Sequence, residues 1–266
     1  MPIVSCNDID IAYELAGDGP ETVVLITGLA DQKEGWELQV PALVEAGYQV
    51  LTLDNRGIGD TSKPDGPYTP RQMAKDVKAL VETLGIRDVH MVGFSMGGMI
   101  AQEFALAYPD CLRSLVLAST YSEPGPFCDR LFNSWRTLTS ASGWEVAVTN
   151  VLLWCFSPTF YEDQPDFAKE VDDGICEIKL SNESFLAQLD AITNFDVTDR
   201  VSGISTPTMV LANEEDILIP PVLSKRLCDQ IAGSKWHMCR GGHASLCEYP
   251  YEFNNTLIEF FDHQGE

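Results

Sequence analysis

Short apolar segments alternate with longer amphipathic segments through most of the chain, and this pattern limits the folds that are open to it. Residues 22–27 form a continuous apolar run, which is typical of a strand covered on both faces. Residues 70–84 instead carry apolar side chains at helical spacing. Since parallel strands need crossovers between them, this alternation predicts right-handed βαβ units and a mostly parallel sheet flanked by helices.

The same pattern places the other elements of the expected α/β fold. We expect further strands at residues 9–15, 48–54, 88–94, 114–119, 207–212 and 235–239. We expect further helices at residues 39–47, 96–109 and 250–263.

The alternation is interrupted over residues 121–200, which are rich in helix formers and aromatic side chains. We interpret this stretch as a helical cap that is inserted after the strand at 114–119. Residues 1–120 and 201–266 then form the core. The alternative is a further layer of helices packed on the sheet, because aromatic residues at helical spacing usually belong to a core.

The charge balance restricts the partners. The chain has 17 basic and 40 acidic residues and a net charge of −23. Binding to nucleic acid or to an anionic membrane needs clustered Lys and Arg, so neither partner is expected. The sequence has no apolar run of spanning length and no signal-peptide pattern, which predicts a cytoplasmic protein. The expected partner is a small-molecule substrate, and the oligomeric state stays open.

Eight cysteines are spread along the chain, and no two have CxxC spacing. Several lie in apolar runs, so we expect free thiols that behave as small core residues. No group of His, Cys and Asp has the spacing of metal ligands. The sequence therefore predicts no metal and no cofactor.

The pentapeptide Gly93-Phe94-Ser95-Met96-Gly97 matches the pattern G-x-S-x-G. The pattern alone is weak, but here it follows an expected strand and precedes an expected helix, which is the setting of a nucleophile elbow. Such a turn needs small residues on both sides of a serine whose hydroxyl is held above the sheet. Ser95 is therefore the candidate nucleophile.

A serine nucleophile needs a base, and the chain has four histidines. His90 and His237 fall within expected strands, and His263 lies at the end of the chain. His243 lies in a glycine-rich loop after the last strand, where catalytic groups gather in open parallel sheets. We therefore choose His243 as the general base.

The base needs a carboxylate to orient it. After an elbow of this kind, the three residues are expected to follow one another along the sequence as nucleophile, acid and histidine. The strand at 207–212 runs into Glu214, Glu215 and Asp216. We choose Asp216, with Glu215 as the alternative. The other two carboxylates are expected to be solvated.

An oxyanion intermediate needs backbone N–H donors. The residue after the nucleophile, Met96, supplies one. The loop after the strand at 22–27 should supply the other, and we choose Leu29.

The chain resembles the α/β-hydrolase superfamily over nearly its whole length. The matching segments are VVLITGLADQKEGW, LTLDNRGIGDTSKP, VHMVGFSMGGMIAQEFA, ANEEDILIPP and GGHASLCEYPYEFN. The GFSMGGMIAQ elbow is similar to that of 3-oxoadipate enol-lactonases, and ITGL is similar to the aminoacrylate hydrolases of pyrimidine breakdown. The resemblance implies hydrolysis of a small ester, lactone or related acyl bond under a helical cap.

The chain departs from the family at one position that matters. Most relatives begin the oxyanion loop with His-Gly, whereas this chain has Thr27-Gly28. The backbone donor survives the change, but the loop must be supported differently. Asp54 and Arg56 resemble the family's structural turn after a strand, so we do not assign them a catalytic role.

Three classes of function stay open. The first is a serine esterase or lactonase. The second uses the same triad for hydrolysis of a carbon–carbon bond in diketones, or for cofactor-free perhydrolysis. The third is a hydrolase fold that only binds a ligand. Ser95 excludes the activities of relatives that have Asp at the elbow, such as haloalkane dehalogenases and epoxide hydrolases.

Three residues of the expected cap are candidates for the substrate pocket. Trp135 and Trp154 are expected to form apolar walls. Arg136 could hold a substrate carboxylate, although a solvated arginine is the alternative. Because a charge of −23 repels anions, we expect neutral esters or lactones to be preferred over carboxylated ones.

Overall fold

A computed structural model of the chain describes residues 2–263. Within this range a sheet has the strand order β1-β2-β4-β3-β5-β6-β7-β8. β1 and β2 pair antiparallel, β2 pairs antiparallel with β4, and the remaining neighbours are parallel. The strands are β1 (Ile3–Cys6), β2 (Ile9–Ala16), β3 (Thr22–Ile26), β4 (Gln49–Leu53), β5 (Val89–Phe94), β6 (Leu112–Ala118), β7 (Thr208–Asn213) and β8 (Lys235–Cys239). The mostly parallel sheet that the sequence predicted is confirmed.

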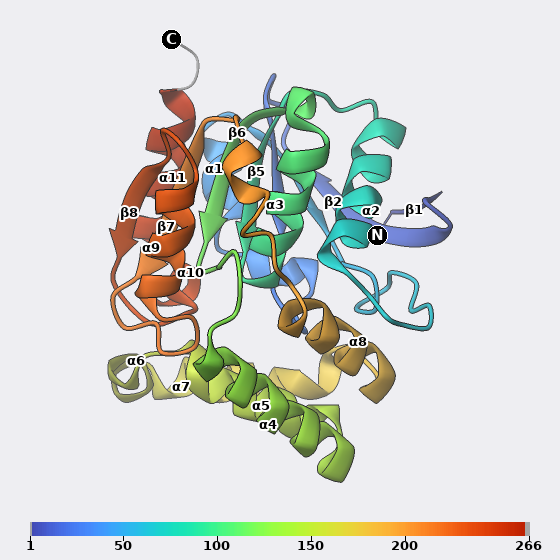
Figure 1. Cartoon of the computed structure of the whole chain (residues 1–266), viewed down its shortest axis with the longest axis vertical. Coiled ribbons are helices and arrows are strands. Elements are labelled where there is room, and N and C mark those ends of the chain that lie inside the picture. The colour runs from blue at the N-terminus through green and yellow to red at the C-terminus, as the bar shows by residue number, and fades with distance from the viewer. Residues whose placement is uncertain (1, 264–266) are drawn as a thin grey trace.

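Helices cover both faces of this sheet (Figure 1). Along β3, Val23 and Leu25 pack in one apolar cluster and Val24 and Ile26 in the other, as the period of a strand requires. The first cluster includes residues of α1 (Val40–Glu45) and α11 (Pro250–Asp262). The second includes residues of α2 (Pro70–Thr83), α3 (Met96–Ala107) and α9 (Pro221–Gln230).

Apart from the short helices, one strand and one helix outside the range 121–200 were not expected from the sequence. β1 has four residues at the edge of the sheet and alternates only between exposed and half-buried side chains, so it carries no apolar run. α9 mixes charged and apolar residues over ten positions and buries only part of one face. Both depend on their neighbours in the fold for stability rather than on a strong local pattern.

Helices also fill the range that was expected to form the cap, residues 121–200, and we call this range the cap. They are α4 (Pro126–Ser142), α5 (Trp144–Cys155), α6 (Pro158–Asp163), α7 (Pro165–Gly174) and α8 (Asn182–Thr193). α4 to α7 lie beyond one end of the sheet rather than on either of its faces (Figure 1). The short helices are η1 (Lys33–Trp36), η2 (Pro109–Cys111), η3 (Ile175–Glu177), η4 (Val201–Gly203) and α10 (Ser245–Glu248).

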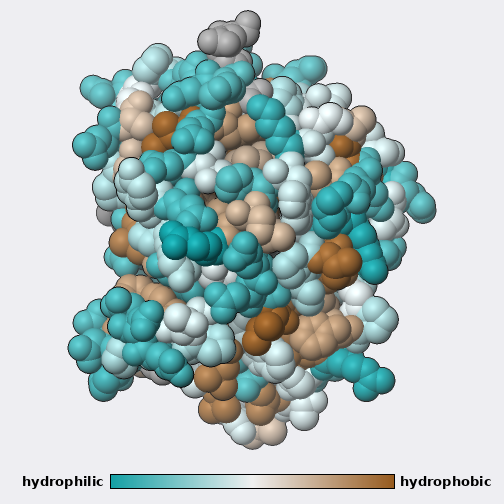
Figure 2. All heavy atoms as spheres, turned by 90° about the vertical axis from the view of Figure 1, so that its left-hand side faces the viewer, coloured by the Kyte–Doolittle hydropathy of each residue, from teal (hydrophilic) through white to brown (hydrophobic). Residues whose placement is uncertain are grey.

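Hydrophilic side chains cover most of the face that Figure 2 shows, as the acidic composition leads one to expect. Hydrophobic residues are scattered among them, and several lie in the lower half of this face, toward the end of the molecule where the cap lies. None of the helices within residues 2–263 is both long enough and apolar enough to cross a membrane.

Candidate active site

Ser95 lies in a strained turn between β5 and α3. Its φ of 54° and ψ of −117° are rare for a residue other than glycine. The turn is held by a backbone hydrogen bond of 2.9 Å from Ser95 N to Ala118 O on β6. The hydroxyl is thereby carried at the end of a central strand, at the N-terminus of a helix, where the helix dipole favours negative charge.

The glycines of the elbow are required by close backbone contacts. A Cβ at Gly93 would lie 2.3 Å from the carbonyl oxygen of Gly97. A Cβ at Gly97 would lie 2.1 Å from the carbonyl oxygen of Ile26 on β3. The small residues expected on either side of Ser95 are therefore dictated by the packing of β3, β5 and α3.

His243 and Asp216 form a buried pair. Nδ1 of His243 lies 2.8 Å from Oδ2 of Asp216, and each residue is 3% exposed. The other carboxylate oxygen of Asp216 accepts hydrogen bonds from the backbone N–H groups of Leu218 (3.0 Å) and Ile219 (2.7 Å). The carboxylate is thus fixed in an orientation that holds one tautomer of the imidazole.

The acidic neighbours of Asp216 do not share its environment. Glu214 and Glu215 are exposed, whereas Asp216 is buried against His243. In the structure, the carboxylate beside the histidine is the one chosen from the sequence rather than Glu215.

A polar network at the ends of β6 and β7 holds the loop that carries His243. The side-chain amide of Asn213 donates to the backbone oxygen of His243 (3.1 Å) and to the hydroxyl of Ser119 (2.8 Å). Ser245 donates to the amide oxygen of Asn213 at 2.7 Å. All three side chains are buried, so the network fixes the histidine loop to the ends of β6 and β7.

Ser95 and His243 line the same pocket. Within residues 2–263 the structure records no hydrogen bond from the Ser95 hydroxyl to the imidazole; such bonds commonly shorten only when a substrate is in place. The ring of Phe94 packs on His243 with 4.9 Å between centroids and helps to hold the imidazole over this pocket.

The loop chosen as the oxyanion loop lies against the nucleophile. A Cβ at Gly28 would lie 3.3 Å from Cβ of Ser95. The N–H of Ala30 is used in a hydrogen bond of 3.0 Å to the side chain of Gln188. No bond from the N–H of Leu29 is recorded among residues 2–263, and Met96 is the first residue of α3, where N–H groups lack a partner within the helix.

Thr27 supports this loop, at the position where the family resemblance led us to expect a histidine. Its hydroxyl donates to the backbone oxygen of Asp31 at 3.0 Å, which closes the turn between them. The side-chain amide of Asn55 lies 3.2 Å from both the backbone and the hydroxyl oxygen of Thr27. The loop is therefore braced from two sides without an imidazole.

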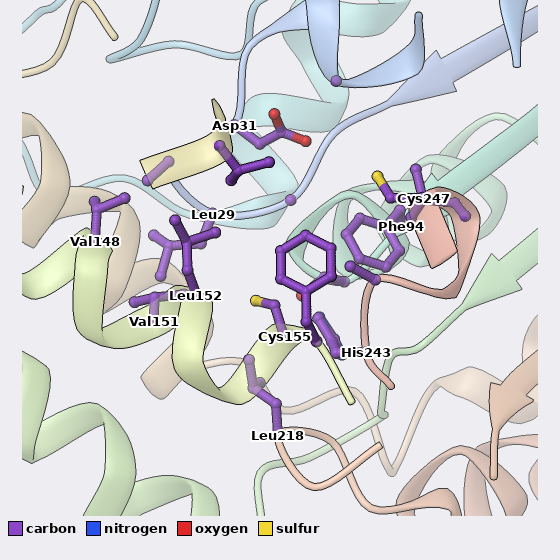
Figure 3. Close-up of a pocket in the computed structure, with 18 of the residues that line it drawn as sticks. Leu29, Asp31, Phe94, Val148, Val151, Leu152, Cys155, Leu218, His243 and Cys247 are labelled. Atoms are coloured by element: carbon purple, nitrogen blue, oxygen red, sulfur yellow. The ribbon is translucent and has the colours of Figure 1, made fainter. Parts of the chain in front are cut away.

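The pocket has a volume of about 270 Å³ and lies between the sheet and the cap. Its walls are mainly aliphatic and aromatic, and Figure 3 shows Val148, Val151 and Leu152 from α5 on one side of it. Trp135 lines it, with its indole N–H bonded to Asn150 at 3.0 Å.

Two residues expected in the pocket do not line it. Trp154 packs against Phe127 instead, with ring centroids 6.1 Å apart. Arg136 forms an ion pair with Asp190, with 2.5 Å between Nη2 and Oδ1, and is 36% exposed. On a helix, residues 135 and 136 point about 100° apart, and here the tryptophan faces the pocket while the arginine points to Asp190. The expectation for Trp154 and Arg136 was wrong on this point.

Two cysteines, Cys155 and Cys247, also line the pocket. Burial raises the pKa of both thiols, to about 12 for Cys247. They therefore stay protonated at neutral pH and are poor nucleophiles. Within residues 2–263 no group of three or more His, Cys, Asp or Glu side chains could hold a metal ion.

Residues 21–249 match the family described as the alpha/beta hydrolase fold. The chain belongs to this family. The assignment agrees with the resemblance drawn from the motifs.

Proteins that are similar to this chain in sequence or in structure carry several names. "Putative carbamate hydrolase RutD" of Azorhizobium caulinodans is 29% identical over 98% of both chains. "Putative non-heme bromoperoxidase BpoC" of Mycobacterium tuberculosis is 32% identical, over 95% of this chain and 98% of its own. The enol-lactonase from Burkholderia xenovorans superposes with a TM-score of 0.90 and 26% identity, covering 98% of this chain and 100% of that one.

Sequence reasoning missed two residues that connect the cap of this hydrolase to its site. Gln188 in α8 is buried and bridges the oxyanion loop to the turn after β4, accepting from Ala30 N and donating to Arg56 O, each at 3.0 Å. Glu248 accepts from the backbone N–H of Ser157 in the cap (2.7 Å) and from that of Gly242 beside the histidine (3.1 Å). No local pattern marks either residue, because their partners are far away in the sequence.

Proposed function

We propose that this chain is a serine hydrolase that cleaves small esters or lactones through an acyl-enzyme. One observation carries the proposal: a strained serine lines the same mainly apolar pocket as His243, whose imidazole is paired with the buried Asp216. Nucleophile, base and orienting acid are the three roles that acyl transfer needs. The names of the enol-lactonase and carbamate hydrolase relatives agree with cleavage at an acyl carbon.

In the first half of the proposed reaction, the Ser95 hydroxyl attacks the acyl carbon while His243 takes its proton. Negative charge moves to the carbonyl oxygen and is stabilised by the N–H groups of Met96 and Leu29. Asp216 stabilises the imidazolium that forms. The imidazolium then gives its proton to the leaving oxygen as the C–O bond breaks, which leaves an ester on Ser95.

In the second half, His243 takes a proton from water, and the hydroxide attacks the acyl-enzyme. The same two N–H groups stabilise the second tetrahedral intermediate, and the proton returns to Ser95 as the acid leaves. The products are one acid and one alcohol, or one hydroxy acid from a lactone. A cavity of about 270 Å³ suits a small substrate.

The test combines a covalent probe with a turnover screen. A fluorophosphonate should label the wild-type protein and should not label Ser95→Ala. In a screen of p-nitrophenyl esters, lactones and vinylogous diketones, hydrolysis of esters or lactones should exceed that of diketones. Ser95→Ala should lose about four decades of rate while its circular dichroism stays the same.

Faster cleavage of the diketones would favour the carbon–carbon hydrolase class instead. Labelling that persists in Ser95→Ala would place the nucleophile elsewhere. A chain that is neither labelled nor active on any of these compounds would be a binding protein rather than an enzyme.

Perhydrolysis is a second candidate, because a relative with 32% identity over 95% of this chain is named as a bromoperoxidase. In that reaction hydrogen peroxide replaces water as the attacking group and the product is a peracid, which oxidises bromide in solution. The triad acts as it does in hydrolysis. Peroxide- and acetate-dependent bromination of monochlorodimedone tests this activity, and it should be lost in Ser95→Ala.

A further inference from the structure

Asp31 places a carboxylate in the wall of the otherwise mainly apolar pocket. It follows Ala30 in the oxyanion loop and lines the same cavity as Ser95 and His243. Figure 3 shows Asp31 and His243 on opposite sides of the pocket in that view, with apolar side chains between them. The proposed reaction steps do not use this carboxylate.

Among the residues that the structure describes, no cation is paired with Asp31. The pocket lining contains no Lys or Arg, and no ion pair of Asp31 is recorded among residues 2–263. The nearest lysine in sequence, Lys33, is turned toward Glu34 (2.5 Å) and Asp54 (3.4 Å). The carboxylate accepts a hydrogen bond from the backbone N–H of Gln32, which leaves most of its acceptor capacity free.

Gly35 in η1 leaves space for the carboxylate. A Cβ at Gly35 would lie 2.5 Å from each carboxylate oxygen of Asp31, so a larger residue at this position would displace the carboxylate from where it lies. The charge also acts on both thiols of the pocket, since it contributes to raising the pKa of Cys155 and of Cys247. The carboxylate is therefore held where its field reaches the cavity.

The energetics favour a positive partner. Burial raises the pKa of Asp31 from 3.8 to about 7; the hydrogen bond from Gln32 lowers it, and the charges of Asp54 and Glu34 add to the rise. A cation nearby would stabilise the ionised form. The aromatic rings in the lining, among them Phe94, Phe156 and Trp135, are also surfaces that alkylammonium groups bind well.

We propose that Asp31 forms a subsite for an alkylammonium group, so that the preferred substrates are small esters or lactones that carry a positive charge. This inference rests on the proposed function and names the substrate class for the same site. The net charge of −23 acts in the same direction, since it attracts cations and repels carboxylated substrates.

Binding to Ser95→Ala tests the subsite without turnover. The probes are two pairs of esters in which a trimethylammonium group is replaced by its uncharged isostere, tert-butyl. One pair carries this group on the alcohol side, as in choline butyrate, and the other carries it on the acyl side. Calorimetry at pH 8 should show that in at least one pair the cation binds tenfold or more tightly than its isostere, about the effect of one close charge pair.

The control for charge is Asp110, an exposed residue that does not line the pocket. Adding Asp31→Asn to Ser95→Ala should remove the preference for the cation, and adding the same replacement at this control position, Asp110→Asn, should change it by less than twofold. Asp31→Ser serves as a second charge-removing variant if the asparagine variant does not fold, which circular dichroism reports.

Equal or tighter binding of both uncharged isosteres would overturn the subsite, and so would no binding of either cation. A preference that survives both Asp31→Asn and Asp31→Ser would also overturn it. Turnover by the protein with Ser95 intact is a separate readout. Preference for the cation without hydrolysis of any ester would support the subsite and contradict the proposed function.

Discussion

The side-chain oxygen of Gln188, in helix α8 of the cap, accepts a hydrogen bond of 3.0 Å from the backbone N–H of Ala30 in the oxyanion loop. The amide nitrogen of the same side chain donates to Arg56 O at 3.0 Å. Ala30 has a positive φ of 57°, a conformation that costs energy in a residue with a Cβ. The cap therefore helps to hold the strained residue next to Leu29, the second donor that we propose for the oxyanion.

This relationship predicts that Gln188→Met lowers kcat more than it changes KM. Methionine fills the space but leaves Ala30 N and Arg56 O without their partner, and Leu29 N then loses its fixed position. Because oxyanion donors act mainly in the transition state, we expect kcat to fall about tenfold or more. Steady-state kinetics on the best ester from the screen measures the effect.

The same replacement at an exposed cap residue, Gln164→Met, is the control and should leave both constants unchanged. Two unpaired buried groups should also cost about 1–3 kcal/mol each in the free energy of unfolding. A Gln188→Met protein that is destabilised but keeps the wild-type kcat would show that the residue only supports the fold.

Asp216→Asn should reduce kcat by several decades while substrate binding is retained. The carboxylate fixes the His243 tautomer, and an amide can donate to Nδ1 and fix the wrong one; in serine proteases the equivalent change costs about four decades. Glu215→Gln removes a neighbouring exposed charge and should have little effect. If Glu215→Gln is the crippling variant and Asp216→Asn is active, the acid of the triad is misassigned.

Trp135 and Trp154 give a matched pair of variants for the pocket. Trp135 lines the cavity and Trp154 does not, although both lie in cap helices. Trp135→Phe should shift the preferred acyl chain toward longer esters, whereas Trp154→Phe should keep the wild-type profile. Phenylalanine is used because removal of a whole buried aromatic side chain costs about 3–5 kcal/mol. The same profile in both variants and the wild type would mean that Trp135 does not limit the chain length.

The Asp31→Asn variant should gain stability relative to the wild type as the pH rises. The pKa of Asp31 is about 7 in the folded protein against 3.8 ordinarily, mainly because of burial, so between these values the folded state binds more protons than the unfolded state. The free energy of unfolding of the wild type therefore falls across this window as pH rises. Asparagine does not titrate, so the difference in Tm, variant minus wild type, should increase from pH 5 to pH 8.

The measurement must separate Asp31 from the groups around it. Asp54, Glu34, Glu37, Cys155, Cys247 and His243 share the pocket or act on Asp31, and all of them are kept in the variant. Their titration is present in both proteins and largely cancels in the difference. A Tm difference that stays constant or decreases with pH would show that Asp31 has an ordinary pKa.

Local patterns in the sequence were enough to predict the fold class and the place of the candidate nucleophile. Both depend on signals that are local in the chain: the apolar runs of buried parallel strands, and the glycines around Ser95. The order nucleophile, acid, histidine then narrowed the triad to residues in two loops, of which His243 and Asp216 lie 2.8 Å apart.

Tertiary structure alone decided which cap residues face the pocket, because the cap helices have apolar residues over broad faces and their rotation depends on packing. Adjacent residues 135 and 136 therefore differ in role, with the tryptophan in the pocket and the arginine paired with Asp190. The bridge from Gln188 to Ala30 and the uncompensated charge of Asp31 also arise from contacts between distant segments. Contacts of this kind leave no period or spacing in the sequence, so they become visible only when the chain is folded.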